Sequence, residues 1–452
     1  MNEIDIEKPV RSALPQTIYQ RKQNWWHHAV LYELYVDKFA NDFRGLTERL
    51  DYIERLGVNC LHILPHYPSP MVDDGYDISE YRAIRSTLGT MDDFKHFTEA
   101  AHARGIYVLV DMVLNHLSSQ HPWFTSARTS HDSPYRNYFL WSDTGTEYSH
   151  AVNPFFHLKP HNWIKNEATN DFYFSTFYPE QPDLNWDEPG VFEDMCASMD
   201  FWIDAGVDAF RFDAAPHLIK REGTNCHGLP ETHALLKRIR ARLDTRHANI
   251  AILGEVEDTL ERTRAYFGNG DECHLLYNFP LAALLVHAAM MGDTGTDTCT
   301  TSSPEEIPPN CAWTNFLRNH DSLVLNLLPP EQQALLRTYA DPGNHFMFRG
   351  EEGLSMRLAS IFAHEPEKVR TAFQLLFSTT GIPVIYYGDE IGMQNDTTID
   401  TSPDTRRFVR GTFDWSKAQQ QMQDPDSLFS FVANTVRTHR GTTPSDVQHA
   451  HR

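Results

Sequence analysis

The sequence predicts an α/β fold, namely a (β/α)8 TIM barrel with a small domain inserted after the third strand. Short apolar, β-branched runs recur eight times along the chain, and amphipathic helical patterns lie between most of them. Near-continuous apolar strands that alternate with helices are typical of a parallel sheet covered on both faces. Eight such units over about 360 residues fit a barrel with insertions. A doubly wound sheet is the structural alternative, but no GxGxxG motif follows any strand, which disfavours dinucleotide binding.

The expected elements follow one another regularly. In the first helical pattern, Leu46, Leu50, Ile53 and Leu56 share one face, and Gly57 is a stop signal. The clearest intervening helices are predicted at residues 45–56, 91–104, 189–205 and 232–243. The predicted barrel strands cover residues 29–36, 60–65, 107–114, 209–215, 250–256, 274–279, 312–318 and 384–387.

The stretch between the third and fourth strands is too long for a connector. It is rich in aromatic residues, Pro, Asn and Asp, and loops longer than about 15 residues are usually functional. We therefore expect an inserted domain over the barrel mouth. The predicted organisation is a first part of the barrel at 1–116, the inserted domain at 117–188, a second part of the barrel at 189–415 and a C-terminal remnant at 416–452.

Composition narrows the classes of partner. The 452 residues carry 39 Lys and Arg against 61 Asp and Glu, a formal net charge of −22. This balance argues against wrapping a nucleic-acid backbone, which needs clustered basic residues, and against an anionic membrane surface. A neutral or cationic small molecule is a more suitable substrate. Hydrophobic residues make up 41% of the chain, which is enough to bury a core and excludes a mostly disordered protein.

Cysteine usage and the first residues indicate the compartment. None of the six cysteines forms a CxxC pair or has metal-ligand spacing, so buried free thiols in a reducing compartment are expected. No basic segment followed by an apolar run begins the chain, so we expect no secretory signal. The prediction is a cytoplasmic protein. The cysteines are Cys60, Cys196, Cys226, Cys273, Cys299 and Cys311.

Polar residues gather where the predicted strands end. Active-site groups of such barrels sit at the C-terminal ends of the strands. The third strand ends DMVLNH, the fourth gives FRFDAAPH, the fifth ILGEV and the seventh FLRNHD. Three acids, two histidines and an arginine are therefore expected at one mouth, namely Asp213, Glu255, Asp321, His116, His320 and Arg211. Asp111 and Asn115 stand at the exit of the third strand as well.

These residue types suit cleavage of a glycosidic bond. That reaction needs one carboxylate as nucleophile or base and one carboxylic acid that protonates the leaving oxygen. Arg211 lies two residues before Asp213, on the same side of a strand, and its charge would keep Asp213 ionised. Strand-end acids that merely cap helices or pair with Arg are the other interpretation. The whole set at corresponding strand ends favours chemistry.

The four strand-end motifs, in this order, resemble the signature regions of glycoside hydrolase family 13, the α-amylase family. QPDLNW at 181–186 and GIPVIYYGDEIG at 381–392 resemble two further regions. Within the family the chain is most similar to trehalose synthases, the maltose α-glucosyltransferases that isomerise maltose to trehalose. MVDDGYDISEY at 71–81, HPWF at 121–124 and REGTNCHGLPET at 221–232 carry that similarity.

The resemblance implies a role for each matching residue. Asp213 would be the nucleophile that forms a glucosyl–enzyme, and Glu255 the general acid/base. Asp321 would hold the sugar 2- and 3-hydroxyls. His116, His320 and Arg211 would surround the same glucose, and Asp77 with Arg410 would clamp its non-reducing end, so that short substrates enter from one end.

The resemblance implies no cofactor for catalysis and leaves a structural calcium ion open. Asn115 and Asp183 match two ligands of a calcium site in the synthases. Lys220 stands where a third, acidic ligand is expected, and an ammonium group there would take the place of the cation. The chain also ends soon after Trp415, so the C-terminal β-domain of family members is expected to be missing. Oligomerisation would be one way to cover the surface left open.

Three functions follow as alternatives. The first is isomerisation of maltose to trehalose by intramolecular glucosyl transfer. The second is an α-glucosidase or amylase-like hydrolase that uses the same triad with water as acceptor. Ser322 follows Asp321 where the synthases have Glu, so the acceptor stays open. A non-catalytic member of the family is the remote third, because such members have lost the acids that are present here.

Overall fold

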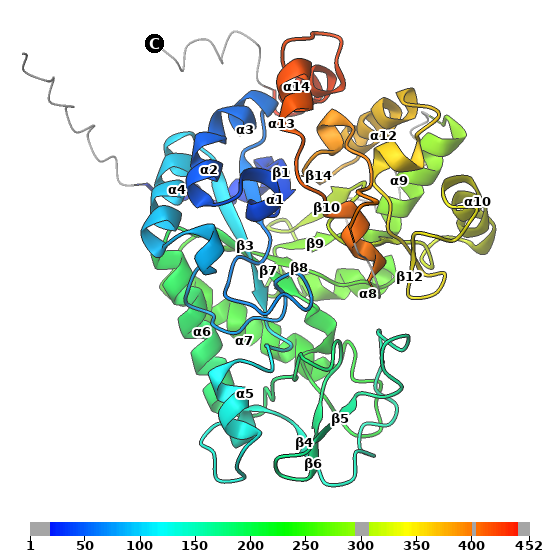
Figure 1. Cartoon of the computed structure of the whole chain (residues 1–452). Coiled ribbons are helices and arrows are strands. Elements are labelled where there is room, and N and C mark those ends of the chain that lie inside the picture. The colour runs from blue at the N-terminus through cyan, green and yellow to red at the C-terminus, as the bar shows by residue number, and fades with distance from the viewer. Residues whose placement is uncertain (1–18, 294–306, 400–403, 442–452) are drawn as a thin grey trace, which may run out of the picture.

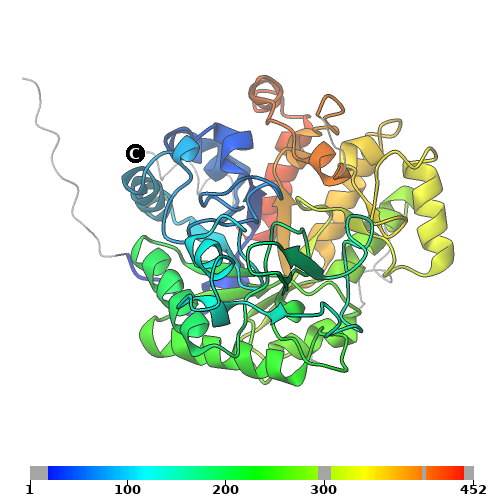
Figure 2. The ribbon, with the colours of Figure 1, turned by 60° about the horizontal axis from the view of Figure 1, so that its bottom comes forward.

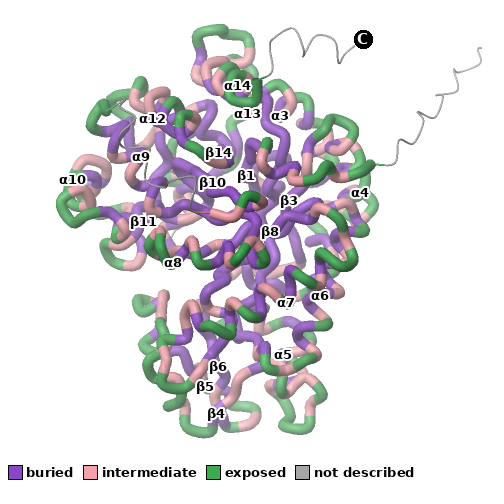
Figure 3. Tube along the Cα trace, turned by 180° about the vertical axis from the view of Figure 1, so that it is seen from behind, coloured by how far each residue is buried: buried purple, intermediate pink, exposed green. Residues whose placement is uncertain are grey.

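Eight parallel strands close into a barrel, in the order β1-β14-β10-β9-β8-β7-β3-β2 (Figure 1). The computed structural model describes residues 19–293, 307–399 and 404–441. Almost every strand residue is buried (Figure 3). The predicted (β/α)8 barrel is confirmed. The barrel strands are β1 (Leu31–Leu34), β2 (Cys60–Ile63), β3 (Tyr107–Val113), β7 (Ala209–Asp213), β8 (Ala251–Gly254), β9 (Leu275–Tyr277), β10 (Ala312–Phe316) and β14 (Ile382–Tyr386).

Helices surround this barrel (Figure 1). The longest, α6 and α7, begin with a proline, whose missing N–H is no loss in a first turn. The helices are α1 (Val36–Ala40), α2 (Phe43–Glu48), α3 (Leu50–Leu56), α4 (Met91–Ala103), α5 (Pro122–Ala127), α6 (Pro189–Asp204), α7 (Pro230–Arg246), α8 (Leu260–Arg264), α9 (Phe279–Met291), α10 (Pro330–Ala340), α11 (Leu358–Ile361), α12 (Glu367–Ser378), α13 (Trp415–Gln421) and α14 (Leu428–His439).

One predicted helix, at 45–56, is two helices. The chain enters α2 already at Phe43, because the Asp42 side chain accepts the Gly45 N–H and caps the first turn. A Cβ on Gly45 would lie 2.1 Å from the carbonyl oxygen of Ala40, so only glycine fits this approach. The chain bends at Arg49 between the two helices, and α3 ends at Gly57, whose φ is +93°.

Two small antiparallel sheets flank the barrel mouth. β4 (Trp141–Ser142), β6 (Asp171–Phe174) and β5 (Trp163–Asn166) pair in that order between β3 and β7, and this sheet lies in front of the barrel in Figure 2. β11 (Leu323–Val324), β13 (Gly353–Leu354) and β12 (Met347–Phe348) form the second sheet after β10. Phe155 and Tyr178, from the segment between β3 and β7, pack against Phe348 of β12. An aromatic cluster thus joins the two sides.

The apolar stretches of the chain are accounted for within the fold. No helix in the described ranges has both the length and the apolar character needed to cross a membrane. The apolar α9 is instead packed against α12, and most of its side chains are buried. Five cysteines are buried free thiols, and Cys299 lies outside the described residues.

His66, directly after β2, behaves as an aromatic core residue. Its ring lies parallel to that of Phe94, with centroids 5.4 Å apart, and meets the edge of Trp202 at 4.7 Å. Neither ring nitrogen has a hydrogen-bond partner in the described part of the chain. Burial lowers the pKa of His66 from 6.5 to about 3, so the ring is neutral.

His66→Phe should stabilise the fold. The substitution keeps the stacking and removes two unpaired polar atoms, for a gain of about 1 kcal/mol in the free energy of unfolding. The free energy of unfolding of the wild type falls as the pH drops below 6.5, because His66 is protonated in the unfolded chain and stays neutral in the folded protein. The gain should therefore be larger at about pH 5.5 than at about pH 7.5 in urea titrations. A gain that shrinks toward acid would contradict the neutral, unpaired ring.

Candidate active site

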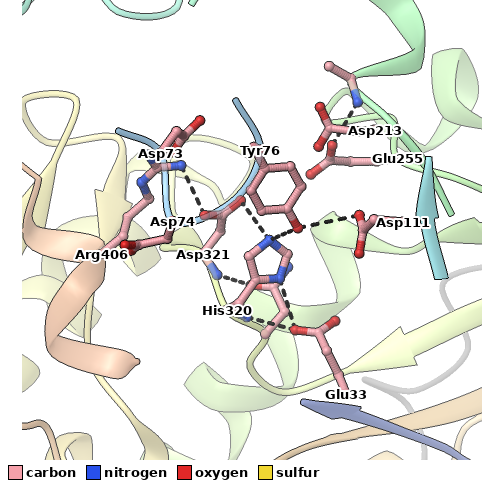
Figure 4. A network of polar contacts seen from close by, with 12 residues as sticks. Glu33, Asp73, Asp74, Tyr76, Asp111, Asp213, Glu255, His320, Asp321 and Arg406 are labelled. Atoms are coloured by element: carbon pink, nitrogen blue, oxygen red, sulfur yellow. Dashed lines mark hydrogen bonds and ion pairs between the residues drawn. The ribbon is translucent and has the colours of Figure 1, made fainter. Parts of the chain in front are cut away.

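A cavity of about 460 Å³ lies at the C-terminal ends of the barrel strands. Its walls are aromatic, with Phe155, Phe177 and Phe348 among them. Its polar lining is acidic, and Figure 4 shows several of these side chains around one space. The polar lining includes Asp73, Tyr76, His116, Asp213, Glu255, Asp321 and Arg406.

Asp213 and Glu255 both contact the guanidinium group of Arg211. Asp213 ends β7, and Glu255 follows β8, the neighbouring strand, where its backbone N–H donates to the Phe212 carbonyl oxygen. Arg211 Nη1 donates to Asp213 Oδ1 at 2.5 Å, and Arg211 Nη2 lies 2.6 Å from Glu255 Oε1. The strand register thus places both carboxyl groups on the same cation. Glu255 Oε2 also accepts the N–H of Ala214, at 2.9 Å.

The electrostatics of the two carboxyl groups differ. Burial raises the pKa of Asp213 above its usual range, against the opposing attraction of Arg211. Burial also raises the pKa of Glu255, and the nearby charge of Asp213 adds to that rise. The pKa of Glu255 is raised further than that of Asp213, so at neutral pH the arrangement favours a proton on Glu255 and an ionised Asp213.

Asp321, the third acid, faces the cavity from the loop after β10. Arg406 Nη1 and Arg410 Nη2 both donate to its Oδ1, at 3.0 and 2.7 Å. Burial alone would raise the pKa of Asp321, but the charges of His320, Arg406 and Arg410 hold it well below the usual range. Asp321 therefore stays ionised.

The two predicted histidines take different positions. Burial lowers the pKa of His116 to about 4, so its ring is neutral. Its Nε2 is buried beside the cavity without a hydrogen-bond partner in the described ranges, and an unpaired buried polar atom suits a sugar hydroxyl. His320 instead lies behind the cavity lining, where its Nδ1 contacts Glu33 at 2.9 Å and its Nε2 contacts the Tyr76 hydroxyl at 2.6 Å.

Asp77 and Arg410, the residues expected to clamp the non-reducing end of the glucose, have other partners than each other in the structure. Asp77 is fully buried and accepts hydrogen bonds within its own loop, from the Ser69 hydroxyl and the N–H groups of Val72 and Asp73. Arg410 pairs with Asp74 at 2.6 Å and with Asp321.

A different ion pair from the same two segments lines the cavity. Arg406 Nη2 donates to Asp73 Oδ1 at 2.8 Å, and Arg406 Nε and Nη2 also donate to Asp404. Sequence reasoning missed Asp73 and Arg406, as well as Tyr76. Both MVDDGYD and DTRRFVR offer several charged residues in a row, and only the turn of the backbone decides which of them points into the cavity.

Asn115 and Asp183, the residues expected to bind calcium, contact the ammonium group of Lys220 instead. Lys220 Nζ donates to Asn115 Oδ1 at 2.7 Å and to the His217 carbonyl oxygen at 2.6 Å, and lies 2.5 Å from Asp183 Oδ2. Throughout the described ranges, no three His, Cys, Asp or Glu side chains are arranged to hold a metal ion. Asn115 and Asp183 therefore do not fit a calcium ion while Lys220 is present.

Comparison with known protein families identifies the family to which this barrel and its cavity belong. A parallel barrel whose strand-end acids meet in one cavity is the architecture of barrel glycosidases. Residues 21–337 and 354–448 match the description "Alpha amylase, catalytic domain". The chain therefore belongs to the α-amylase family, which confirms the resemblance of its motifs.

Its relatives include trehalose synthases. The chain is 40% identical over 381 residues to a trehalose synthase/amylase of Mycolicibacterium smegmatis, covering 82% of this chain and 64% of that protein. It is 36% identical to a trehalose synthase of Pimelobacter, over 84% of this chain and 69% of the relative. Against the Mycolicibacterium enzyme, then, the chain spans less than two thirds of the relative's length.

Solved structures share the fold. A trehalulose synthase of Pseudomonas mesoacidophila superposes with a TM-score of 0.73 at 25% identity, over 92% of this chain and 84% of that one. An isomaltulose synthase of Protaminobacter rubrum gives a TM-score of 0.71 at 25% identity, over 93% and 84%.

Lys220→Met should destabilise the fold by about 3 kcal/mol, because it leaves the fully buried Asp183 without its cation. Urea unfolding measures the change. Lys165→Met, at an exposed lysine that contacts Asn170 and lies over the Phe172 ring, is the matched control and should change stability by less than about 1 kcal/mol. The melting temperature of the wild type should not respond to a calcium chelator. A drop of several degrees on chelation would show that an ion holds this place.

Proposed function

We propose that the protein transfers an α-glucosyl group of short α-glucosides through a covalent intermediate on Asp213, and that its reaction is the isomerisation of maltose to trehalose. The observation that carries this proposal is the pair of Asp213 and Glu255 on the single guanidinium of Arg211. A shared cation keeps the two carboxyl groups close. Retaining glycosidases need a separation of about 5 Å, whereas inverting enzymes need a wider gap for water.

The first half of the reaction breaks the glycosidic bond. Asp213 attacks the anomeric carbon, while Glu255 donates its proton to the glycosidic oxygen. Glucose leaves with that proton, and an ester joins the glucosyl group to Asp213. A raised pKa at Glu255 suits the acid, and an ionised Asp213 suits the nucleophile.

The second half decides between isomerase and hydrolase. For trehalose, the released glucose turns within the cavity, and its anomeric hydroxyl attacks the anomeric carbon of the glucosyl ester. Asp213 leaves as the carboxylate, and Glu255 takes the proton back. Water must be excluded meanwhile. The cluster of Phe155, Tyr178 and Phe348 and the ion pair of Arg349 with Glu257 connect the parts around the cavity mouth and support such an enclosure.

The remaining polar groups would bind the transferred glucose. Asp321, held ionised by two arginines, would accept hydrogen bonds from two sugar hydroxyls. His116 would use its unpaired Nε2 on another hydroxyl, and the Tyr76 ring would stack on the sugar face. We assign the clamp at the non-reducing end to Asp73 and Arg406, whose ion pair would stop longer chains from passing through.

An amylase-like hydrolase with the same first half is the second candidate, favoured by relatives named for amylase activity. A non-catalytic role is disfavoured because Asp213, Glu255 and Asp321 all line the cavity. We also propose that the protein works in the cytoplasm, since the described cysteines are unpaired thiols.

Incubation of the purified protein with maltose tests the proposal. Chromatography of the products should show mostly trehalose, with glucose as the minor product. Mostly glucose would assign the protein to the hydrolases.

Asp213→Asn, prepared in parallel, controls for contaminating activity and should lose at least about a thousandfold in rate. If the wild type cleaves neither maltose nor an aryl α-glucoside, or if Asp213→Asn keeps its activity, the proposed mechanism is wrong.

A further inference from the structure

His62, on β2, is fully buried inside the barrel between two carboxylates. Its Nε2 lies 2.8 Å from Asp111 Oδ2, and its Nδ1 lies 3.2 Å from Glu33 Oε2. The three side chains come from neighbouring strands, β1, β2 and β3, and none of them has exposed surface. None of the roles above uses His62.

These groups belong to a closed ring of hydrogen bonds behind the cavity. Glu33 Oε1 contacts His320 Nδ1 at 2.9 Å, and the Tyr76 hydroxyl lies 2.6 Å from His320 Nε2 and 3.4 Å from Asp111 Oδ1. Figure 4 shows Glu33, His320, Tyr76 and Asp111 along this path. His62 closes it between Asp111 and Glu33.

The ring is tied to the catalytic pair through Arg211. Arg211 Nη1 donates to Asp111 Oδ1 at 2.5 Å, the same distance as to Asp213. One guanidinium therefore serves Asp111, Asp213 and Glu255 together. The position of Arg211 depends on where Asp111 is held, and His62 is the second side chain that holds Asp111.

The hydrogen-bond geometry favours a charged imidazole at His62, whose Nδ1 lies 3.2 Å from Glu33 Oε2 and 3.3 Å from the Tyr277 hydroxyl. Both ring nitrogens face carboxylate oxygens, which accept hydrogen bonds, and only the doubly protonated ring has two N–H groups to donate. The two flanking charges outweigh the cost of burial and raise the pKa of His62 to about 9. The titratable and charged groups around the ring are Glu33 of β1, Asp111 of β3, Arg211 of β7, Tyr277 of β9, Tyr76 and His320.

We propose that His62 is a positively charged positioning residue of the sugar site, which neutralises Glu33 and Asp111 and thereby fixes Arg211, His320 and Tyr76. The expected effect of His62 on catalysis rests on the proposed glucosyl transfer. The expected charge of the His62 ring does not. Without this charge, two buried carboxylates would compete for protons and for Arg211, and the support of Asp213 would weaken.

The direction in which the pH profile of kcat/KM shifts in variants tests the charge of His62. Loss of a positive charge near Asp213 makes its ionisation harder, so His62→Gln should move the acidic limb of kcat/KM to higher pH. Glu33→Gln removes a negative charge and should move the limb to lower pH. The double variant, with both charges gone, should lie near the wild type.

The experiment measures cleavage of 4-nitrophenyl α-glucoside across pH by these variants. His62→Gln should lower kcat about 10–100-fold, with a much smaller change in KM, because the side chain does not line the cavity. His66→Phe, at a buried histidine four residues away with no polar partner, is the matched control and should keep the wild-type profile. The proposal would be overturned if the acidic limb of kcat/KM did not move in His62→Gln. It would also be overturned if His62→Gln, Glu33→Gln and the double variant all shifted that limb equally.

A second measurement does not depend on activity or on the variants being stable. In wild-type protein with ¹⁵N-labelled histidine, the His62 signals should show a doubly protonated ring at neutral pH. A neutral ring would overturn the proposal by itself. If instead the wild type cleaves no α-glucoside, the proposed function fails, while the charge of His62 is still decided by this spectrum.

Discussion

The buried guanidinium of Arg211 is the interaction on which the rest of the site depends. It is 1% exposed and contacts Asp111 of β3, Asp213 of β7 and Glu255, which directly follows the neighbouring strand β8. Removing a cation from water is costly unless several partners satisfy it. Three carboxyl groups offset that cost here, and the strand order places them within reach. The same cation limits how far burial raises the pKa of Asp213 and Glu255.

Support for this cation extends through the barrel interior. Asp111 connects Arg211 to His62, and His62 connects it to Glu33. Lys220 forms a second buried connection, between Asn115 at the end of the barrel strand and Asp183 of the insertion. One network orders the floor of the cavity, and the other ties the inserted segment, whose Phe155 and Phe177 line the cavity, to the barrel. Both use a side-chain cation enclosed by buried acceptors.

The barrel was predictable because apolar strands recur eight times and because strand-end residues must share one edge of a parallel sheet. The same rule predicts that Asp213, Glu255 and Asp321 lie together, and all three line the cavity. Their catalytic roles stay predictions. Loop geometry was not predictable in this way. The turn that buries Asp77 depends on hydrogen bonds that the N–H groups of Val72 and Asp73 donate to the Asp77 carboxylate. The Asp73 side chain then accepts from Arg406. The charge of His62 depends on neighbours 29 and 49 residues away.

Trapping of the covalent intermediate tests the central claim most directly. A 5-fluoro-α-glucosyl fluoride has a good leaving group, and its ring fluorine slows the second step, so the glucosyl–enzyme should accumulate. Peptide mass spectrometry should then find the added sugar on Asp213. A label on any other residue, or turnover of the reagent without any labelled peptide in rapid-quench samples, would contradict an account in which Asp213 attacks and Glu255 protonates.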